Sequence, residues 1–198
     1  MENQPGTRDR IVIAAASLLQ RQGYVGTAIK QIAKEANATL GSVYHFFPGG
    51  KEAVAVAAIK HGEGEFASVL RTALDSREEP GAAVDACARE LAENLRKSGW
   101  TDGCPVTAAA LETLGTDSEI QLACAAALRN WEHLVSERLI RSGFSPADAR
   151  DLATTVISAL EGAEVASQVR RSEDPLHTTG RHLARLVDSY PTGPAAQD

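Results

Sequence analysis

Apolar residues recur along this chain at the spacing of helix faces, and this pattern restricts the fold more than any other feature. Ile11, Ala14, Ala15, Leu18 and Leu19 follow the i, i+3, i+4, i+7, i+8 order of one helix face. Similar stripes continue almost to the end of the chain, and no segment alternates convincingly as a half-buried strand would. The sequence therefore predicts an all-α fold of about nine helices.

Start and stop signals predict where the helices begin and end. We expect Thr7 to cap the first helix and Gly23 to end it. The segment Ser145-Pro146-Ala147-Asp148 combines a cap, a proline at the first helical position and an acid in the first turn. It predicts the start of a long helix. The other helices are expected at about 28–36, 40–47, 51–74, 84–95, 108–114, 120–142 and 174–190.

Charge is divided unequally along the chain, whose net charge is −6. Residues 1–50 carry a small basic excess, and the remainder carries the acidic excess. Because an acidic surface repels phosphate, nucleic acid would have to meet the N-terminal end. No apolar run approaches the roughly 20 residues of a membrane helix, and residues 1–4 lack signal-peptide features. We therefore expect a cytoplasmic protein without a membrane partner.

The segment from Leu40 to Phe47 has the pattern of a short exposed helix. Val43, Phe46 and Phe47 share one face and are expected to pack inward. The outward face carries small residues near its start, which suit base edges in a major groove, and then larger polar side chains, which suit phosphate oxygens. Taken alone, those larger side chains would be a surface aromatic and a solvated histidine. The outward residues are Leu40, Gly41, Ser42, Tyr44 and His45.

Two threonines and a lysine flank this segment. Thr27 and Thr39 are expected to cap the second and third helices, and a capping hydroxyl can also meet phosphate. Lys51 opens the next helix, where a cation opposes the helix dipole unless an anion lies nearby. The turn Asn37-Ala38-Thr39 suits a helix-turn-helix, which predicts binding to double-stranded DNA.

Residues 7–60 resemble the DNA-binding region of the tetracycline-repressor (TetR) family. The resemblance rests on TAIKQIAKEANATLGSVYHFF, which begins at Thr27, and on the following Lys51-Glu52-Ala53-Val54. Asn37 replaces a turn glycine but tolerates the left-handed conformation, whereas Leu40 replaces a frequent lysine and removes a backbone contact. Other segments resemble the LmrA/YxaF-like branch: Phe47-Pro48-Gly49-Gly50-Lys51, Gly103-Cys104-Pro105, Ala110-Leu111-Glu112, Leu160-Glu161-Gly162-Ala163 and Asp174-Pro175-Leu176.

The body is expected to serve as a dimerisation and effector-binding region. The resemblance implies a homodimer whose body encloses a cavity for a small hydrophobic or aromatic effector. The helix from about Ala147 is apolar nearly all round, which favours a partner over its second face. The expected dimer interface is Val156, Leu160, Ala163, Leu183, Leu186 and Val187, and the candidate cavity residues are Phe66, Trp100, Cys104, Leu111 and Trp131. Burial in the core is an equally good interpretation of the tryptophans and a better one of Cys104.

These features predict a helix-turn-helix domain at 1–50, a ligand-binding and dimerisation domain at 51–190, and a disordered tail at 191–198. The predicted function is that of a ligand-released repressor, bound as a homodimer to a near-palindromic operator. One alternative is an activator or ligand-independent regulator of the same fold.

A second alternative is an all-helical enzyme or metal-binding protein. We expect no catalytic residue, metal or cofactor, because convergent groups of this kind are missing from the sequence. The cysteines form no CxxC pair, and we read the histidines as lacking acids at helical spacing. These residues are Cys87, Cys104, Cys124, His61, His133, His177 and His182.

Overall fold

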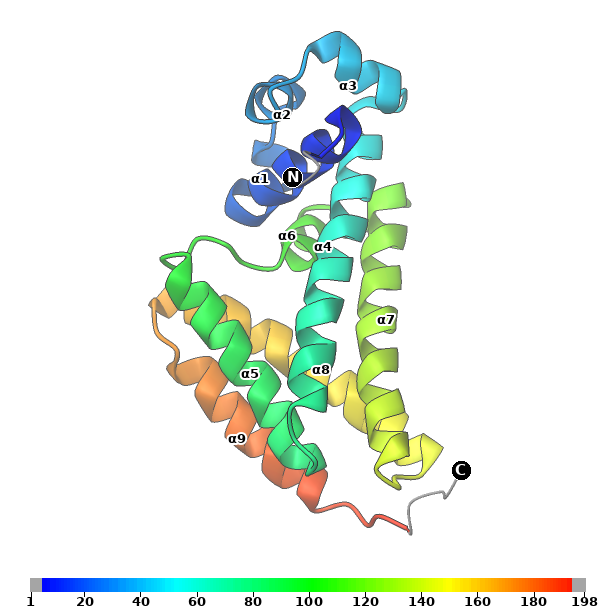
Figure 1. Ribbon diagram of the computed structural model, residues 1–198, viewed down its shortest axis with the longest axis vertical. Coiled ribbons are helices and arrows are strands. Elements are labelled where there is room, and N and C mark those ends of the chain that lie inside the picture. Colours follow the sequence, from blue (N-terminus) through cyan, green and yellow to red (C-terminus); the bar gives the residue numbers. More distant parts are fainter. Residues whose placement is uncertain (1–4, 194–198) are drawn as a thin grey trace. The chain divides into compact units, whose positions relative to one another are not determined.

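The computed structural model describes residues 5–193, and within them the chain forms nine α-helices and no strand (Figure 1). The predicted all-α fold is confirmed. None of the helices in this part of the chain is both long enough and apolar enough to cross a membrane. The helices are α1 (Thr7–Gly26), α2 (Ile29–Glu35), α3 (Leu40–Phe46), α4 (Gly50–Asp75), α5 (Pro80–Lys97), α6 (Pro105–Glu112), α7 (Glu119–Arg141), α8 (Pro146–Arg170) and α9 (Asp174–Asp188).

The first helix differs from its prediction at both ends. It begins at Thr7 itself, so the predicted Thr7 cap is wrong, and no side chain caps it. The Thr7 hydroxyl instead accepts a hydrogen bond from Arg10 Nη2 at 3.2 Å. Gly23 interrupts the helical dihedral angles with φ 70°, as its stop signal predicted, although the element continues to Gly26.

The start of α8 follows its prediction. The Ser145 hydroxyl accepts a hydrogen bond from the backbone N–H of Asp148 at 3.1 Å, and Pro146 takes the first helical position. At the other end of the chain, residues 191–193 belong to no helix or strand. The rest of the predicted tail, residues 194–198, lies outside the described residues.

The chain packs as two compact units, which are considered separately. The first contains the described residues up to Gly64 together with Cys104–Ala127, and the second contains Glu65–Gly103 and the described residues from Leu128 onward. The chain passes from one unit to the other within α4, between Gly103 and Cys104, and within α7. A functional division at residue 50 stays a prediction.

In the first unit, α1 packs against α2, α3 and α6. The predicted stripe of α1 supplies its core, since Ile11 and Leu19 are almost fully buried. Ile32 of α2 and Val43 of α3 are equally buried, which fixes these two short helices against α1. Their own length would leave them marginal in water, so this packing stabilises them.

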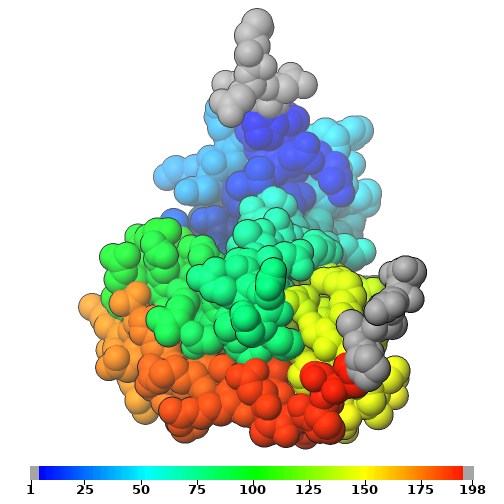
Figure 2. Space-filling view, turned by 60° about the horizontal axis from the view of Figure 1, so that its bottom comes forward, coloured from blue at the N-terminus to red at the C-terminus, as the bar shows by residue number. Residues whose placement is uncertain are grey.

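In the second unit, α5 packs along α9, and α8 contacts both helices. The outer side of α9 forms an orange band on the surface of this unit in Figure 2. Close approach of α5 and α9 depends on Gly180, because a Cβ there would lie only 2.7 Å from the Cβ of Ala88. Trp131 of α7 is fully buried in this unit.

Candidate nucleic-acid interface

The turn between α2 and α3 adopts the geometry that the sequence predicted. Asn37 has φ 48°, a left-handed conformation that asparagine tolerates better than most residues. The N–H of Ala38 donates to the carbonyl of Ala33 at 2.9 Å, which closes the end of α2. Arg10 also fixes this turn, because its Nε donates to the carbonyl of Ala36 at 3.1 Å. Sequence reasoning missed Arg10, since nothing in its spacing distinguishes it from a solvated basic residue of α1.

Thr39 caps α3, as predicted. Its Oγ1 accepts a hydrogen bond from the backbone N–H of Ser42 at 3.0 Å and lies 2.9 Å from the Ser42 hydroxyl oxygen. The prediction for Thr27 is wrong, because α2 follows Ala28 and no side chain caps it. Thr27 is 1% exposed and donates its hydroxyl hydrogen to the carbonyl of Gly23 at 2.6 Å. A hydroxyl buried in this way is not available to phosphate.

The outward face of α3 contains most of the residues predicted for it. Leu40, Gly41, Tyr44 and His45 are exposed, with Tyr44 at 51% of its possible surface, and Ser42 is half-buried. Small groups therefore lie near the start of the helix, and two larger polar side chains lie further along. This arrangement can offer close backbone approach to base edges and polar atoms to phosphate oxygens.

The inward face of α3 is narrower than predicted. Val43 and Phe47 are buried, but Phe46 is 39% exposed, so its prediction as a core residue is wrong. Its ring instead meets the ring of His45 edge to face, with 5.0 Å between ring centres. Helical spacing placed Phe46 beside Val43, but a helix of two turns has room for little inward surface against α1.

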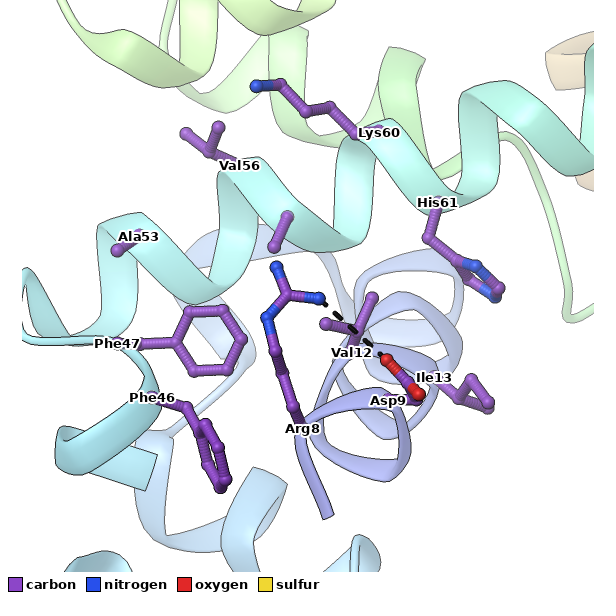
Figure 3. Close-up of a pocket in the computed structure, with 11 residues that line it drawn as sticks. Arg8, Asp9, Val12, Ile13, Phe46, Phe47, Ala53, Val56, Lys60 and His61 are labelled. Atoms are coloured by element: carbon purple, nitrogen blue, oxygen red, sulfur yellow. Dashed lines mark ion pairs between the residues drawn. The ribbon is translucent and has the colours of Figure 1, made fainter. Parts of the chain in front are cut away.

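Phe46 borders an open groove of about 610 Å³ between α1, α3 and α4. Figure 3 shows the Arg8 side chain reaching from α1 past the ring of Phe47. The guanidinium carbon lies 5.5 Å from the ring centre, and a nitrogen of the same group lies 3.8 Å from a carboxylate oxygen of Asp9. The Arg8 cation thus lies against the ring of the buried Phe47 and lines the groove together with Asp9.

Lys51 lies in the first turn of α4 and is half-buried. Its Nζ lies 4.3 Å from the centre of the Tyr24 ring and donates to the carbonyl of Val25 at 3.4 Å. Burial, with a smaller contribution from the charge of Glu52, raises the pKa of Tyr24. The phenol therefore stays neutral and presents its ring to the lysine, which gives the cation partners inside its own unit.

The candidate cavity residues belong to both units, with Cys104 and Leu111 in the first and the three aromatic residues in the second. Phe66 and Trp131 contact each other, with 4.4 Å between ring centres. Trp100 is half-buried in the loop after α5 and has φ 69°. Leu111 is 61% exposed on α6, and its place in an effector cavity stays a prediction. Cys104 is half-buried and caps α6, where its Sγ accepts a hydrogen bond from the N–H of Thr107 at 3.4 Å.

Two other cysteines are inert thiols in the core. Burial raises the pKa of Cys87 to about 12 and that of Cys124 to about 11. Both thiols are therefore protonated at neutral pH and are poor nucleophiles. The prediction that the histidines lack an acid at helical spacing is wrong for His133, whose Nε2 lies 3.2 Å from a carboxylate oxygen of Glu137, one helical turn away on α7.

The residues predicted for the dimer interface belong to the core of the second unit. Five of the six are at most 7% exposed, and only Leu186, at 36%, has substantial free surface. The apolar stripes of α8 and α9 cover each other and α5 within the single chain, so these five side chains leave little free surface, and their assignment to a dimer interface stays a prediction. The exposed apolar side chains of α8 are Val165 and Val169. The five buried residues are Val156, Leu160, Ala163, Leu183 and Val187.

A capped, exposed recognition-type helix joined by a tight turn to a second short helix defines the protein as a helix-turn-helix DNA-binding protein. Residues 11–58 match the bacterial regulatory proteins of the tetR family, and residues 80–182 match the C-terminal domain of LmrA/YxaF-like transcriptional regulators. The chain belongs to the TetR family, within its LmrA/YxaF-like group, which confirms the resemblance. It is a transcriptional regulator and not an enzyme.

Individual relatives cover nearly the whole chain. The regulator LmrA of Bacillus subtilis (strain 168) is 31% identical, over 86% of this chain and 90% of the relative. YxaF of the same organism is 29% identical, over 94% and 98%. A regulatory protein TetR from Rhodobacter sphaeroides has a TM-score of 0.79 at 24% identity, covering 90% of this chain and 97% of that one. A CifR cysteine mutant complexed with 26-base-pair operator DNA has a TM-score of 0.76 at 23% identity, covering 96% and 100%.

Proposed function

We propose that this protein is a transcriptional repressor that binds a near-palindromic operator as a homodimer and is released by a small apolar or aromatic effector. The observation that carries the proposal is the exposed pair Tyr44 and His45 on a helix whose opposite face is buried through Val43 and Phe47. Such a helix is held rigidly and presents polar atoms outward, as recognition of a groove requires.

The predicted outward residues of α3 each have a role in this proposal. Leu40, Gly41 and Ser42 approach base edges, and Tyr44 and His45 donate to phosphate oxygens that fix the register of the helix. Thr39 is an exposed residue, and its capping hydroxyl adds a further phosphate contact. The hydrogen bond from Lys51 to the Val25 carbonyl is longer and weaker than most. Lys51 can therefore give it up for a phosphate oxygen, with which it forms a stronger, charge-assisted hydrogen bond.

A homodimer places two copies of α3 on one face of DNA. We assign its interface to exposed apolar side chains of the second unit, which are Val165 and Val169 of α8 and Leu186 of α9. A two-fold axis through such a surface makes the same patch self-complementary. Recognition helices about 34–36 Å apart would then read half-sites one helical turn apart. The two-fold symmetry of the dimer explains why the operator should be near-palindromic.

The effector is expected to bind in the second unit, where the rings of Phe66 and Trp131 would offer it apolar surface if they separated. A ligand that prefers a dimer with the wrong helix spacing lowers DNA affinity by its coupling energy, typically about 1–3 kcal/mol. One observation favours the alternative of a ligand-independent regulator or activator. Trp131 is fully buried and already packed on Phe66, so an effector must separate the two rings.

The test is a gel-shift titration of the full chain against the DNA upstream of its own gene, with an unrelated fragment of equal length as control. Specific retardation that weakens steeply with salt supports operator binding through several phosphate contacts. Release by members of a panel of apolar and aromatic compounds supports an effector-controlled repressor. Retention of the complex across the whole panel favours the ligand-independent alternative. Equal affinity for both fragments overturns operator recognition.

A further inference from the structure

Glu112, the last residue of α6, reaches residues 23–27 within the first unit, where α1 ends beyond its break at Gly23; this segment is called the α1–α2 turn. One carboxylate oxygen, Oε2, accepts a hydrogen bond from the backbone N–H of Val25 at 2.8 Å. The other oxygen lies against the α-carbon of Gly23. A charged acceptor makes a stronger hydrogen bond with a backbone N–H than a neutral one does. An exposed side chain on α6 is therefore attached to the backbone that leads into the helix-turn-helix.

Gly23 is shaped to receive this carboxylate. A Cβ at position 23 would lie only 2.8 Å from the Cδ of Glu112, closer than real carbon atoms pack. The same residue has φ 70° and ψ −177°, which only glycine adopts readily. The dihedral angles therefore require glycine at position 23, and a side chain there would also displace the Glu112 carboxylate from its present position.

The backbone of Val25 is held from two sides by opposite charges. Glu112 accepts from its N–H, while Lys51 of α4 donates to its carbonyl at 3.4 Å. These two side chains bring α6 and α4 to one residue of the turn. Lys51, which is predicted to contact phosphate, therefore binds the same residue as Glu112 does.

The turn passes this restraint on to α2. The Thr27 hydroxyl donates to the carbonyl of Gly23 at 2.6 Å, and Gln22 Nε2 donates to the carbonyl of Gly26 at 2.9 Å. The same Gln22 nitrogen donates to Oε1 of Gln31, in α2, at 2.9 Å. Because these hydrogen bonds link the α1–α2 turn to α2, a side chain that holds Val25 also fixes the position of α2. The turn that follows α2 in turn orients α3.

We infer that Glu112 is a positioning residue for operator binding, which holds the α1–α2 turn through Val25 and so fixes the helix-turn-helix and Lys51. Ala110-Leu111-Glu112 is one of the segments that resemble the LmrA/YxaF-like branch, and it makes none of the proposed DNA contacts. The inferred role explains what Glu112 in this segment does. It rests on the proposed function, because it concerns the same DNA-binding surface. Any motion of α6 relative to α1 would act on Val25 directly.

The experiment compares full-length Glu112→Ala, Glu112→Gln and Asp117→Ala with the wild type. Asp117 is an exposed acid after α6, so its replacement matches the loss of charge without touching the turn. Each protein is titrated against the upstream fragment, and the amide of Val25 is followed by ¹⁵N NMR and hydrogen exchange. We expect Glu112→Ala to lose about tenfold in affinity and to lose protection of the Val25 amide. Glu112→Gln keeps an acceptor oxygen and should restore most of both, whereas a general effect of charge would appear equally in Asp117→Ala.

The outcomes separate this inference from the proposed function. If the wild type binds the fragment and Glu112→Ala binds equally well, the role of Glu112 is overturned while operator binding stands. If the wild type shows no specific binding, the proposed function fails and the role in DNA binding fails with it. Circular dichroism checks that every variant is folded, and an unfolded Glu112→Ala with a folded, fully active Glu112→Gln supports the hydrogen bond as the essential contact.

Discussion

The hydroxyl of Thr39 accepts the backbone N–H of Ser42 at 3.0 Å and so fixes the first turn of α3. This contact matters because α3 runs only from Leu40 to Phe46, and a helix of that length is marginal without a cap. It also directs the start of the helix, where Gly41 and Ser42 would approach DNA.

Replacement of Thr39 by alanine should lower the free energy of unfolding by about 1 kcal/mol, because the N–H of Ser42 loses its acceptor. Thr39→Ser keeps the oxygen and should lose much less. Urea denaturation followed by circular dichroism measures both. Equal stability of the alanine and serine variants would show that the cap contributes nothing.

Trp131→Ala should destabilise the protein by about 3–5 kcal/mol, because it empties a fully buried site against Phe66. Leu111→Ala should change the stability by less than about 0.5 kcal/mol, because that side chain is 61% exposed. Thermal unfolding compares the two variants. A small loss for Trp131→Ala would argue that the ring occupies a cavity rather than the core.

Glu164 should make the stability depend on pH. Burial first, and then the nearby charge of Glu161, raise the pKa of Glu164 from 4.5 to about 8. Between these values the unfolded chain releases the proton and the folded chain keeps it, so stability falls as the pH rises through the window. Below the lower value this contribution is fully present.

Glu164→Gln cannot ionise, so it should unfold at a higher temperature than the wild type near pH 8 and show a flatter profile from there down to about pH 5. The exposed Glu90→Gln serves as the matched control, and its profile should follow the wild type. Differential scanning calorimetry across this range makes the comparison. If the unfolding temperatures of Glu164→Gln and the wild type changed in parallel with pH, the Glu164 side chain would be exposed to water rather than buried.

Val169→Glu should weaken the dimer more than about tenfold, because two copies of the new charge would meet across the interface. Val169 is 80% exposed in the single chain, so the fold should survive. Leu122→Glu, at a site on α7 that is 62% exposed, controls for the added charge. Analytical ultracentrifugation gives the dissociation constants. A dissociation constant unchanged by Val169→Glu would show that this part of α8 does not lie in the interface.

Periodicity predicted the helices well because each one buries a stripe against its neighbours, and the stripe is visible in the order of residues. Val43 and Phe47 show this in α3, and Ile11 and Leu19 show it in α1. The left-handed Asn37 was predictable for a different reason, since the conformational preference of asparagine is local.

Other features depend on contacts that one sequence does not show. The stripe through Val156 and Leu160 indicates a covered face, but it does not say whether α9 of the same chain or a second chain covers it. Phe46 was misplaced for a related reason, because spacing gives a direction around the helix but not how far the neighbouring helix extends. The contact of Glu112 with Val25 joins residues far apart in the chain, so it had no local signal beyond the glycine at position 23.

The central claim is that the exposed face of α3 binds DNA, and the affinity of Tyr44 and His45 variants for the upstream fragment tests it most directly. Fluorescence anisotropy at fixed salt should show Tyr44→Ala and His45→Ala each binding about tenfold more weakly than the wild type, with the exposed Lys34→Ala nearly unchanged. Wild-type affinity in both α3 variants, with the fold intact by circular dichroism, would contradict the account.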